Sequence, residues 1–146
     1  QRRMTRIFTK NKNEFFDDYA HHPTEISSIL DGIKKAYNKR KIITVFEPHR
    51  YSRVMSLKQS FSKSFVNSDL VLICPIYAAG EKKNSNFNLN NFAKLISKNS
   101  ETQVIIAKNQ KDLSNFFQKN LISNEIIIGM GAGSISSWMR ELKFTL

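Results

Sequence analysis

The stretch IITVFEPHRYSR, Ile42–Arg53, contains the pattern that decides the fold of this chain. Its first part, Ile42–Phe46, is apolar and rich in β-branched residues, as in a strand that is covered on both faces of a sheet. A polar cluster follows directly, and a helical spacing of apolar residues begins after it. A buried strand that ends in a polar turn and leads into a helix indicates an α/β protein.

The same pattern recurs along the chain. Other short, nearly continuous apolar runs occur at Glu14–Ala20, Asp69–Ala78, Thr102–Lys108 and Glu125–Gly133. Between the runs, apolar residues fall at helical spacing in Pro23–Asn38, with proline in the first turn, and in similar stripes over 53–66, 88–98 and 110–121. This alternation predicts parallel strands joined by right-handed helical crossovers. A polar break at Lys10–Asn13 between two extended runs predicts an antiparallel hairpin at the N-terminal edge.

Composition narrows the class of protein. The chain has 146 residues and one cysteine, Cys74, which lies inside an apolar run. This length predicts a single domain, and one cysteine excludes a disulfide framework and fits a reducing compartment. No apolar run approaches the roughly 20 residues of a membrane helix, so we expect a cytoplasmic protein. The chain begins QRRM rather than with an initiator methionine, and we expect it to be cut from something longer.

The net charge of +11 suits a partner rich in phosphate, and nucleic acid is the first class to consider. However, the lysines are scattered, and no arginine-rich stripe alternates with aromatic residues. The polar clusters also contain carboxylates, which repel a phosphate backbone. We therefore expect neither a nucleic-acid nor a membrane partner, and a basic α/β nucleic-acid-binding module stays as the alternative of another class.

The unusual polar residues follow the predicted strands, where ligands of open parallel sheets bind. They form four clusters, Asp17–His22, Glu47–Arg53, Tyr77–Glu81 and Gly131–Gly133. One of the two aspartates could instead cap a helix or hold the turn. The glycines could serve a ligand or a tight turn.

Arg50 and Arg53 lie one helical turn apart near a predicted helix start, where the helix dipole disfavours cations. Two guanidinium groups held there favour a bound carboxylate or phosphate. His21 and His22 are too close together to complete a zinc site, so no metal site is predicted. The sequence also has no GxxxxGK[ST] phosphate loop and no Gly-x-Ser-x-Gly nucleophile motif.

In this order, the motifs DDYAHHPTEI, FEPHRYSR, YAAGE and GAG resemble the C-terminal domain of the Mur ligases. Within that family they are most similar to members that join L-alanine to UDP-N-acetylmuramate, and the resemblance spans essentially the whole chain. It implies a Rossmann-like three-layer α/β sandwich. The sheet would be mostly parallel, with about six strands and an antiparallel N-terminal edge strand.

The resemblance also implies a function. Mur ligases have a UDP-sugar domain, a central ATP-binding domain and a C-terminal domain that receives the amino acid, and residues 1–146 would be only the third. ATP phosphorylates the sugar carboxylate, and the amine of L-alanine attacks the acyl phosphate, in the synthesis of peptidoglycan precursors. The central domain would hold most of the ATP and the Mg²⁺. The fragment alone would be inactive, with no catalytic residue of its own.

Site residues are transferred by motif from this resemblance. The nucleotide-binding set is Arg2, Arg3 and Asp18, with Asp18 at the ribose of ATP. The substrate-binding set is Tyr19, His21, His22, His49, Arg50 and Arg53, with the last two at the carboxylate of alanine.

Two departures from the family pattern affect this transfer. Gln1 and Met4 flank the arginine pair where relatives carry Gly and Phe, and the loop from Lys82 lacks the usual Pro and Gly. A sister ligase that recycles the intact tripeptide shares the HHPT turn and is the nearest alternative.

Overall fold

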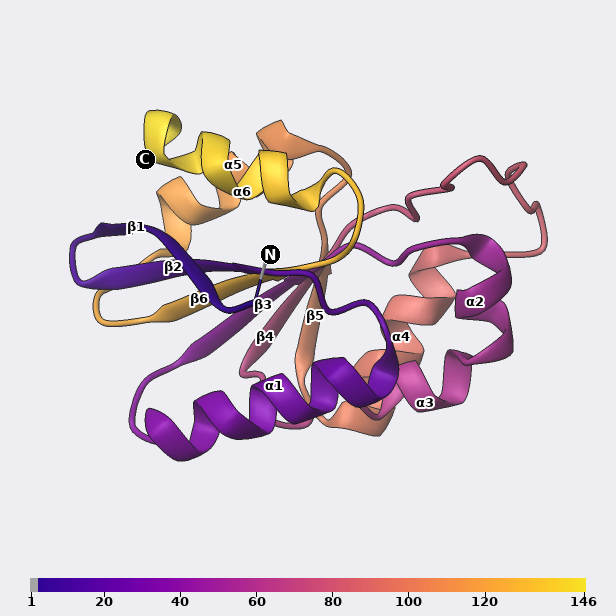
Figure 1. Cartoon of the computed structure of the whole chain (residues 1–146), viewed down its shortest axis with the longest axis horizontal. Coiled ribbons are helices and arrows are strands. Elements are labelled where there is room, and N and C mark those ends of the chain that lie inside the picture. The colour runs from indigo at the N-terminus through magenta and orange to yellow at the C-terminus, as the bar shows by residue number, and fades with distance from the viewer. Residues whose placement is uncertain (1–2) are drawn as a thin grey trace.

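The computed structural model describes residues 3–146, which form one sheet with helices on both faces (Figure 1). The strands are β1 (Thr5–Lys10), β2 (Asn13–Asp18), β3 (Ile42–Phe46), β4 (Leu70–Ile73), β5 (Gln103–Ile106) and β6 (Ile126–Met130). The helices are α1 (Pro23–Ala36), α2 (Tyr51–Ser56), α3 (Lys58–Ser62), α4 (Leu89–Ser100), α5 (Gln110–Asn120) and α6 (Ile135–Thr145). The predicted three-layer α/β fold is confirmed.

The six strands follow the order β1-β2-β6-β3-β4-β5. All neighbouring pairs are parallel except β1 and β2, so the predicted antiparallel edge strand is confirmed. Asn11 and Lys12 form the turn between β1 and β2, with φ angles of 53° and 63°. Positive φ at both central residues is typical of a tight hairpin turn whose twist matches that of the strands.

Two apolar cores cover the faces of the sheet. One lies under α1, α3 and α4, where the ring of Phe46 packs 5.1 Å from Phe65 and 5.7 Å from Phe61. The other lies under α5 and α6, where Phe15 meets the edge of Phe117 at 5.8 Å. Because both faces are covered, β3, β4 and β6 are buried along their whole lengths.

The helix predicted over 53–66 differs from the structure. It is two short helices, α2 and α3, which are interrupted at Leu57, and α2 already begins at Tyr51. The hydroxyl of Ser56 donates a hydrogen bond to the carbonyl of Arg53 at 3.3 Å, which competes with the helical backbone pattern. The predicted start of α1 at Pro23 is confirmed.

Helix α6 was not among the predicted stripes. Its buried residues Ile135, Met139 and Leu142 do have helical spacing, but the segment before them is a run of small residues without a strong start signal. The helix packs closely on β6, as the glycine in this strand shows. A Cβ atom at Gly129 would lie only 2.4 Å from Cγ of Met139. Gly129 therefore permits this approach.

The cysteine is structural. Cys74 is fully buried just after β4, and burial, with the charge of Glu47, raises the pKa of its thiol far above the ordinary value. Among the helices of residues 3–146, none combines the length and the apolar character that crossing a membrane would require.

Candidate functional site

The carboxyl ends of the parallel strands meet at one edge of the sheet. Asp18 at the end of β2 pairs in register with Met130 of β6, and Met130 pairs with Phe46 of β3. Phe46 in turn pairs with Ile73 of β4. The loops after these residues carry the polar clusters that the sequence singled out, so the fold gathers them at this edge.

Asp18 fixes the turn that follows β2. It is only 2% exposed, and its carboxylate accepts hydrogen bonds from the backbone N–H groups of Met4 at 2.7 Å and Ala20 at 2.8 Å. Each carboxylate oxygen therefore has a backbone donor, and the side chain ties the entry of β1 to the exit of β2. In the structure Asp18 holds the turn, which is one of the alternatives that the sequence left open for the two aspartates. The contact of Asp18 with a nucleotide stays a prediction.

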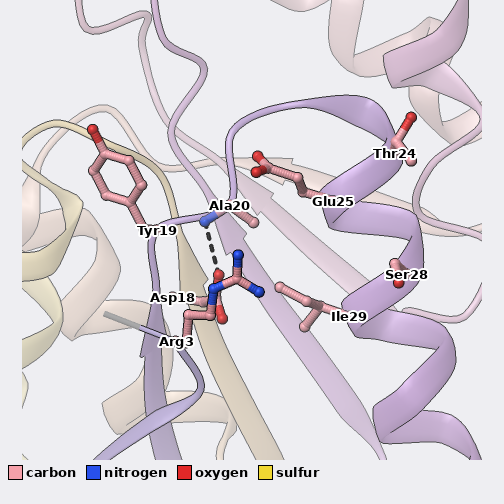
Figure 2. Close-up of a pocket in the computed structure, with 8 residues that line it drawn as sticks. All are labelled: Arg3, Asp18, Tyr19, Ala20, Thr24, Glu25, Ser28 and Ile29. Atoms are coloured by element: carbon pink, nitrogen blue, oxygen red, sulfur yellow. Dashed lines mark hydrogen bonds between the residues drawn. The ribbon is translucent and has the colours of Figure 1, made fainter. Parts of the chain in front are cut away.

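A pocket of about 260 Å³ opens beside this turn. Figure 2 shows Arg3 and Asp18 among the residues that line this pocket, with the first turns of α1 across from them. Thr24, Glu25 and Ser28 supply further polar groups to the lining. Arg3 and Asp18, both predicted to bind a nucleotide, thus line one pocket, whereas Arg2 lies outside the described residues. Charges of both signs and hydroxyl groups suit a polar ligand.

Aromatic and imidazole rings from several loops form a second cluster. The ring of His21 meets the edge of Tyr19 at 5.1 Å and lies 5.3 Å from the ring of His22. It also lies 5.6 Å from His49, which stacks on Tyr77 at the same centroid distance. The predicted residues Tyr19, His21, His22 and His49 are therefore neighbours. We define these four residues with Tyr77 as the ring cluster.

Arg53 lies beside the ring cluster. Its side chain is partly buried, and its Nη1 atom lies 3.3 Å from Nδ1 of His49, which can accept the hydrogen bond when the ring is neutral. Burial is the largest cause that lowers the pKa of His49 below its ordinary value of 6.5. The charges of His21, Arg53 and Arg50 lower this pKa further, and only Glu81 raises it.

The lowered pKa of His49 predicts how stability depends on pH. Between the folded pKa and the unfolded value of 6.5, the unfolded chain binds more protons, so the free energy of unfolding rises with pH. We expect the melting temperature to fall from about pH 7.5 to about pH 5.5. His49→Gln should flatten this slope in thermal melts followed by circular dichroism. Identical slopes for the variant and the wild type would contradict this prediction.

Arg50 has an unusual backbone conformation. It precedes α2 with φ 71° and ψ 128°, a region that side chains rarely occupy, and its N–H donates to the carbonyl of Tyr77 at 2.9 Å. Its side chain is exposed at the sheet edge. Strained residues of this kind concentrate at ligand sites, where the surrounding structure holds them in place.

The strained backbone at Arg50 predicts that a glycine variant is more stable than an alanine variant. Arg50→Gly should be more stable than Arg50→Ala by about 1 kcal/mol, because glycine adopts positive φ without a Cβ clash. Both variants lose the guanidinium, so the comparison isolates the backbone. Urea unfolding of the 146-residue chain measures it. An alanine variant as stable as the glycine variant would show that the backbone here is relaxed.

The glycine motif has a packing role in the structure. A Cβ atom at Gly131 would lie 3.0 Å from the carbonyl oxygen of Glu47, and one at Gly133 would lie 2.4 Å from the ring of Tyr77. The buried carboxylate of Glu47 accepts hydrogen bonds from the backbone N–H of Ile135 at 3.1 Å and from the hydroxyl of Ser134. Glu47 thereby caps α6 and fixes the glycine turn against β3.

Sequence reasoning missed individual roles for Tyr77 and Glu81, although their motif was noticed. Tyr77 belongs to the ring cluster, and Glu81 accepts hydrogen bonds from Ser52 at the start of α2. The position of their motif after a buried strand was the available signal. Asp17 faces α6 instead, where its carboxylate accepts hydrogen bonds from Ser136 at 2.7 Å and Arg140 at 3.4 Å.

Residues 2–133 match the family described as Mur ligase, glutamate ligase domain. The chain belongs to the Mur ligases. Among curated relatives, the UDP-N-acetylmuramate–L-alanine ligase of Pelagibacter ubique is 49% identical over 142 residues, which are 97% of this chain and 31% of that protein. The ligase of the same name from Rickettsia felis is 39% identical over 145 residues, which cover 97% of this chain and 30% of the relative.

Solved Mur ligase structures have the same fold. The UDP-N-acetylmuramate-alanine ligase of Thermotoga maritima superposes with a TM-score of 0.74 at 22% identity, over 98% of this chain and 29% of that one. A murein peptide ligase from Psychrobacter arcticus has a TM-score of 0.79 at 22% identity, and the match covers 99% of this chain and 30% of that one. A ligase domain from Haemophilus ducreyi has a TM-score of 0.72 at 21% identity, and the match covers 99% of this chain and all of that domain. This chain spans about 30% of the length of the first two proteins.

Proposed function

We propose that this Mur ligase chain, residues 1–146, is the amino-acid-receiving C-terminal domain of an ATP-dependent ligase. That ligase joins L-alanine to UDP-N-acetylmuramate for peptidoglycan synthesis. The observation that carries the proposal is 49% identity, along 97% of the chain, to a ligase named for this reaction. The match to the Haemophilus domain, which the chain covers completely, supports the proposal that this chain is a separate structural domain. The UDP-sugar domain and the central ATP-binding domain would then lie in the rest of the parent. The parent would work in the cytoplasm.

The substrate site lies at the ring cluster in this proposal. Arg53 belongs to α2 and contacts His49, and Arg50 directly precedes the same helix on an exposed turn. Their guanidinium groups would bind the carboxylate of alanine, because planar, charged donors suit a carboxylate. Tyr19 and the three histidines would shape the pocket around the amine and the methyl group.

The nucleotide contact lies at the adjacent pocket. Arg2 and Arg3 would approach the phosphates of ATP, and Asp18 would accept a hydrogen bond from the ribose through a remaining lone pair. We assign Mg²⁺ and most ATP contacts to the rest of the parent, as the resemblance to the Mur ligases implies. When bound, Mg²⁺ neutralises phosphate charge.

The contribution of this chain to the reaction is positioning. The arginines would orient alanine so that its amine reaches the acyl phosphate of the UDP-sugar, and the carboxylate would stay away from the reacting carbon. Holding two reactants in the attacking geometry lowers the entropic part of the barrier. A reaction of this kind needs no protein nucleophile.

The test uses the full-length parent with ATP, Mg²⁺, UDP-N-acetylmuramate and L-alanine, and phosphate release is measured. We expect turnover with L-alanine and none with the intact tripeptide in its place. The 146-residue chain alone should give no turnover, because its sequence contains no phosphate loop. Preference for the tripeptide would support the recycling ligase, and turnover by the chain alone would contradict the domain assignment.

A further inference from the structure

The helix that carries the arginine pair begins without a cap of its own. Helix α2 has six residues, its N-cap residue Arg50 gives no side-chain hydrogen bond, and its first turn contains no acidic residue. Arg50, at the N-cap, also places positive charge at the positive end of the helix dipole. The local sequence therefore disfavours the conformation that holds both guanidinium groups at the site.

Glu81 supplies the missing cap from a distant loop. Its Oε1 accepts a hydrogen bond from the backbone N–H of Ser52 at 3.2 Å, and its Oε2 accepts one from the Ser52 hydroxyl. These hydrogen bonds, with that from the Ser52 hydroxyl as the largest cause, lower the pKa of Glu81. The carboxylate thus satisfies an orphan donor of the first turn and offsets the unfavourable charge.

The loop that bears Glu81 is itself tied to the residues before α2. Tyr77 donates its N–H to the carbonyl of Pro48 at 2.8 Å and accepts from the N–H of Arg50 at 2.9 Å. A tight turn then joins Ala78 to Glu81 through a hydrogen bond of 3.1 Å. The segment Tyr77–Glu81 consequently holds the strained residue Arg50 from both sides.

We propose that Glu81 is a positioning residue, which acts through Ser52 to hold Arg50 and Arg53 in the orientation that receives the amino-acid carboxylate. This inference rests on the proposed function of the two arginines. Glu81 does not itself contact the amino acid. Its contribution is the geometry of the first turn of α2.

The test measures steady-state kinetics of the full-length parent. Glu81→Ala should raise KM for L-alanine by about tenfold and leave KM for ATP within about twofold. Glu81→Gln keeps an acceptor oxygen and should raise KM for L-alanine only about threefold. Because Glu81 and Ser52 share one contact, adding Ser52→Ala to Glu81→Ala should cause no further increase.

Asp112 offers a matched control. It is a half-buried carboxylate in the first turn of α5, on the opposite face of the sheet from α2, and it accepts a hydrogen bond from the backbone N–H of Lys108 at 3.0 Å. Asp112→Ala should leave both KM values unchanged. A merely structural role of Glu81 would instead lower kcat at constant KM, through a smaller folded fraction, and that result would overturn the proposal.

Hydrogen exchange of the α2 amides, measured on the same preparations, tests the positioning role of Glu81 separately from the proposed function. Glu81→Ala should speed exchange at Ser52 and its neighbours by about tenfold, and Asp112→Ala should not. Unchanged exchange would overturn the positioning role even if the parent uses alanine. If the wild-type parent does not use alanine, the proposed function fails, and exchange still decides whether Glu81 holds α2.

Discussion

Arg53→Ala in the full-length parent is expected to lower kcat/KM for L-alanine about ten- to a hundred-fold, the loss of a charge-assisted hydrogen bond to the carboxylate. The KM for ATP should change much less. Arg53 is partly buried beside His49, so its guanidinium is held by the protein before any ligand arrives. This preorganisation reduces the entropy lost on binding.

Two further variants sharpen this prediction. Arg53→Lys should restore only part of the activity, because an ammonium group cannot reproduce two parallel hydrogen bonds. Arg6→Ala is the control, since the Arg6 side chain is 61% exposed on β1 and pairs with Glu14 away from the site. Steady-state kinetics with one substrate varied at a time give both parameters. Unchanged alanine kinetics in both Arg53→Ala and Arg50→Ala would remove the arginines from the pocket.

Much of the fold could be predicted because its signals are local. The runs at Ile42–Phe46 and Glu125–Gly133 are apolar throughout, which parallel strands with two covered faces require. Their chain direction then places each following polar cluster at the same edge of the sheet. The insertion of β6 between β2 and β3 could not be predicted in this way, because strand order depends on contacts between distant segments.

The sequence indicated which polar clusters the fold would bring to one edge of the sheet, but it did not indicate the contacts between their residues. Arg50 carries no local signal for positive φ, since arginine does not favour that region. The cap from Glu81 to Ser52 joins residues 29 positions apart, and the stacking of Tyr77 on His49 likewise crosses between two loops. Such contacts follow from the tertiary arrangement rather than from any spacing along the chain.

Asp18→Asn is expected to lower the free energy of unfolding by about 3 kcal/mol, because the amide keeps one acceptor and turns its NH₂ group toward a backbone donor. The affected donors are the N–H groups of Met4 and Ala20, at a side chain that is 2% exposed. Urea unfolding of the 146-residue chain measures the loss. Asp31→Asn is the control, since Asp31 is exposed and forms a surface ion pair with Lys35, and it should change the free energy by less than about 0.5 kcal/mol.

The same variant also tests the nucleotide contact. If the buried carboxylate both holds the turn and accepts a ribose hydroxyl, the Asp18→Asn parent should show a raised KM for ATP at a temperature where it remains folded, with a smaller change for L-alanine. The two effects share a cause, because the turn that Asp18 ties to β1 also forms the wall of the pocket next to Arg3. A stability loss with unchanged KM for ATP would restrict Asp18 to holding the turn, and the ribose would then need another acceptor in this pocket.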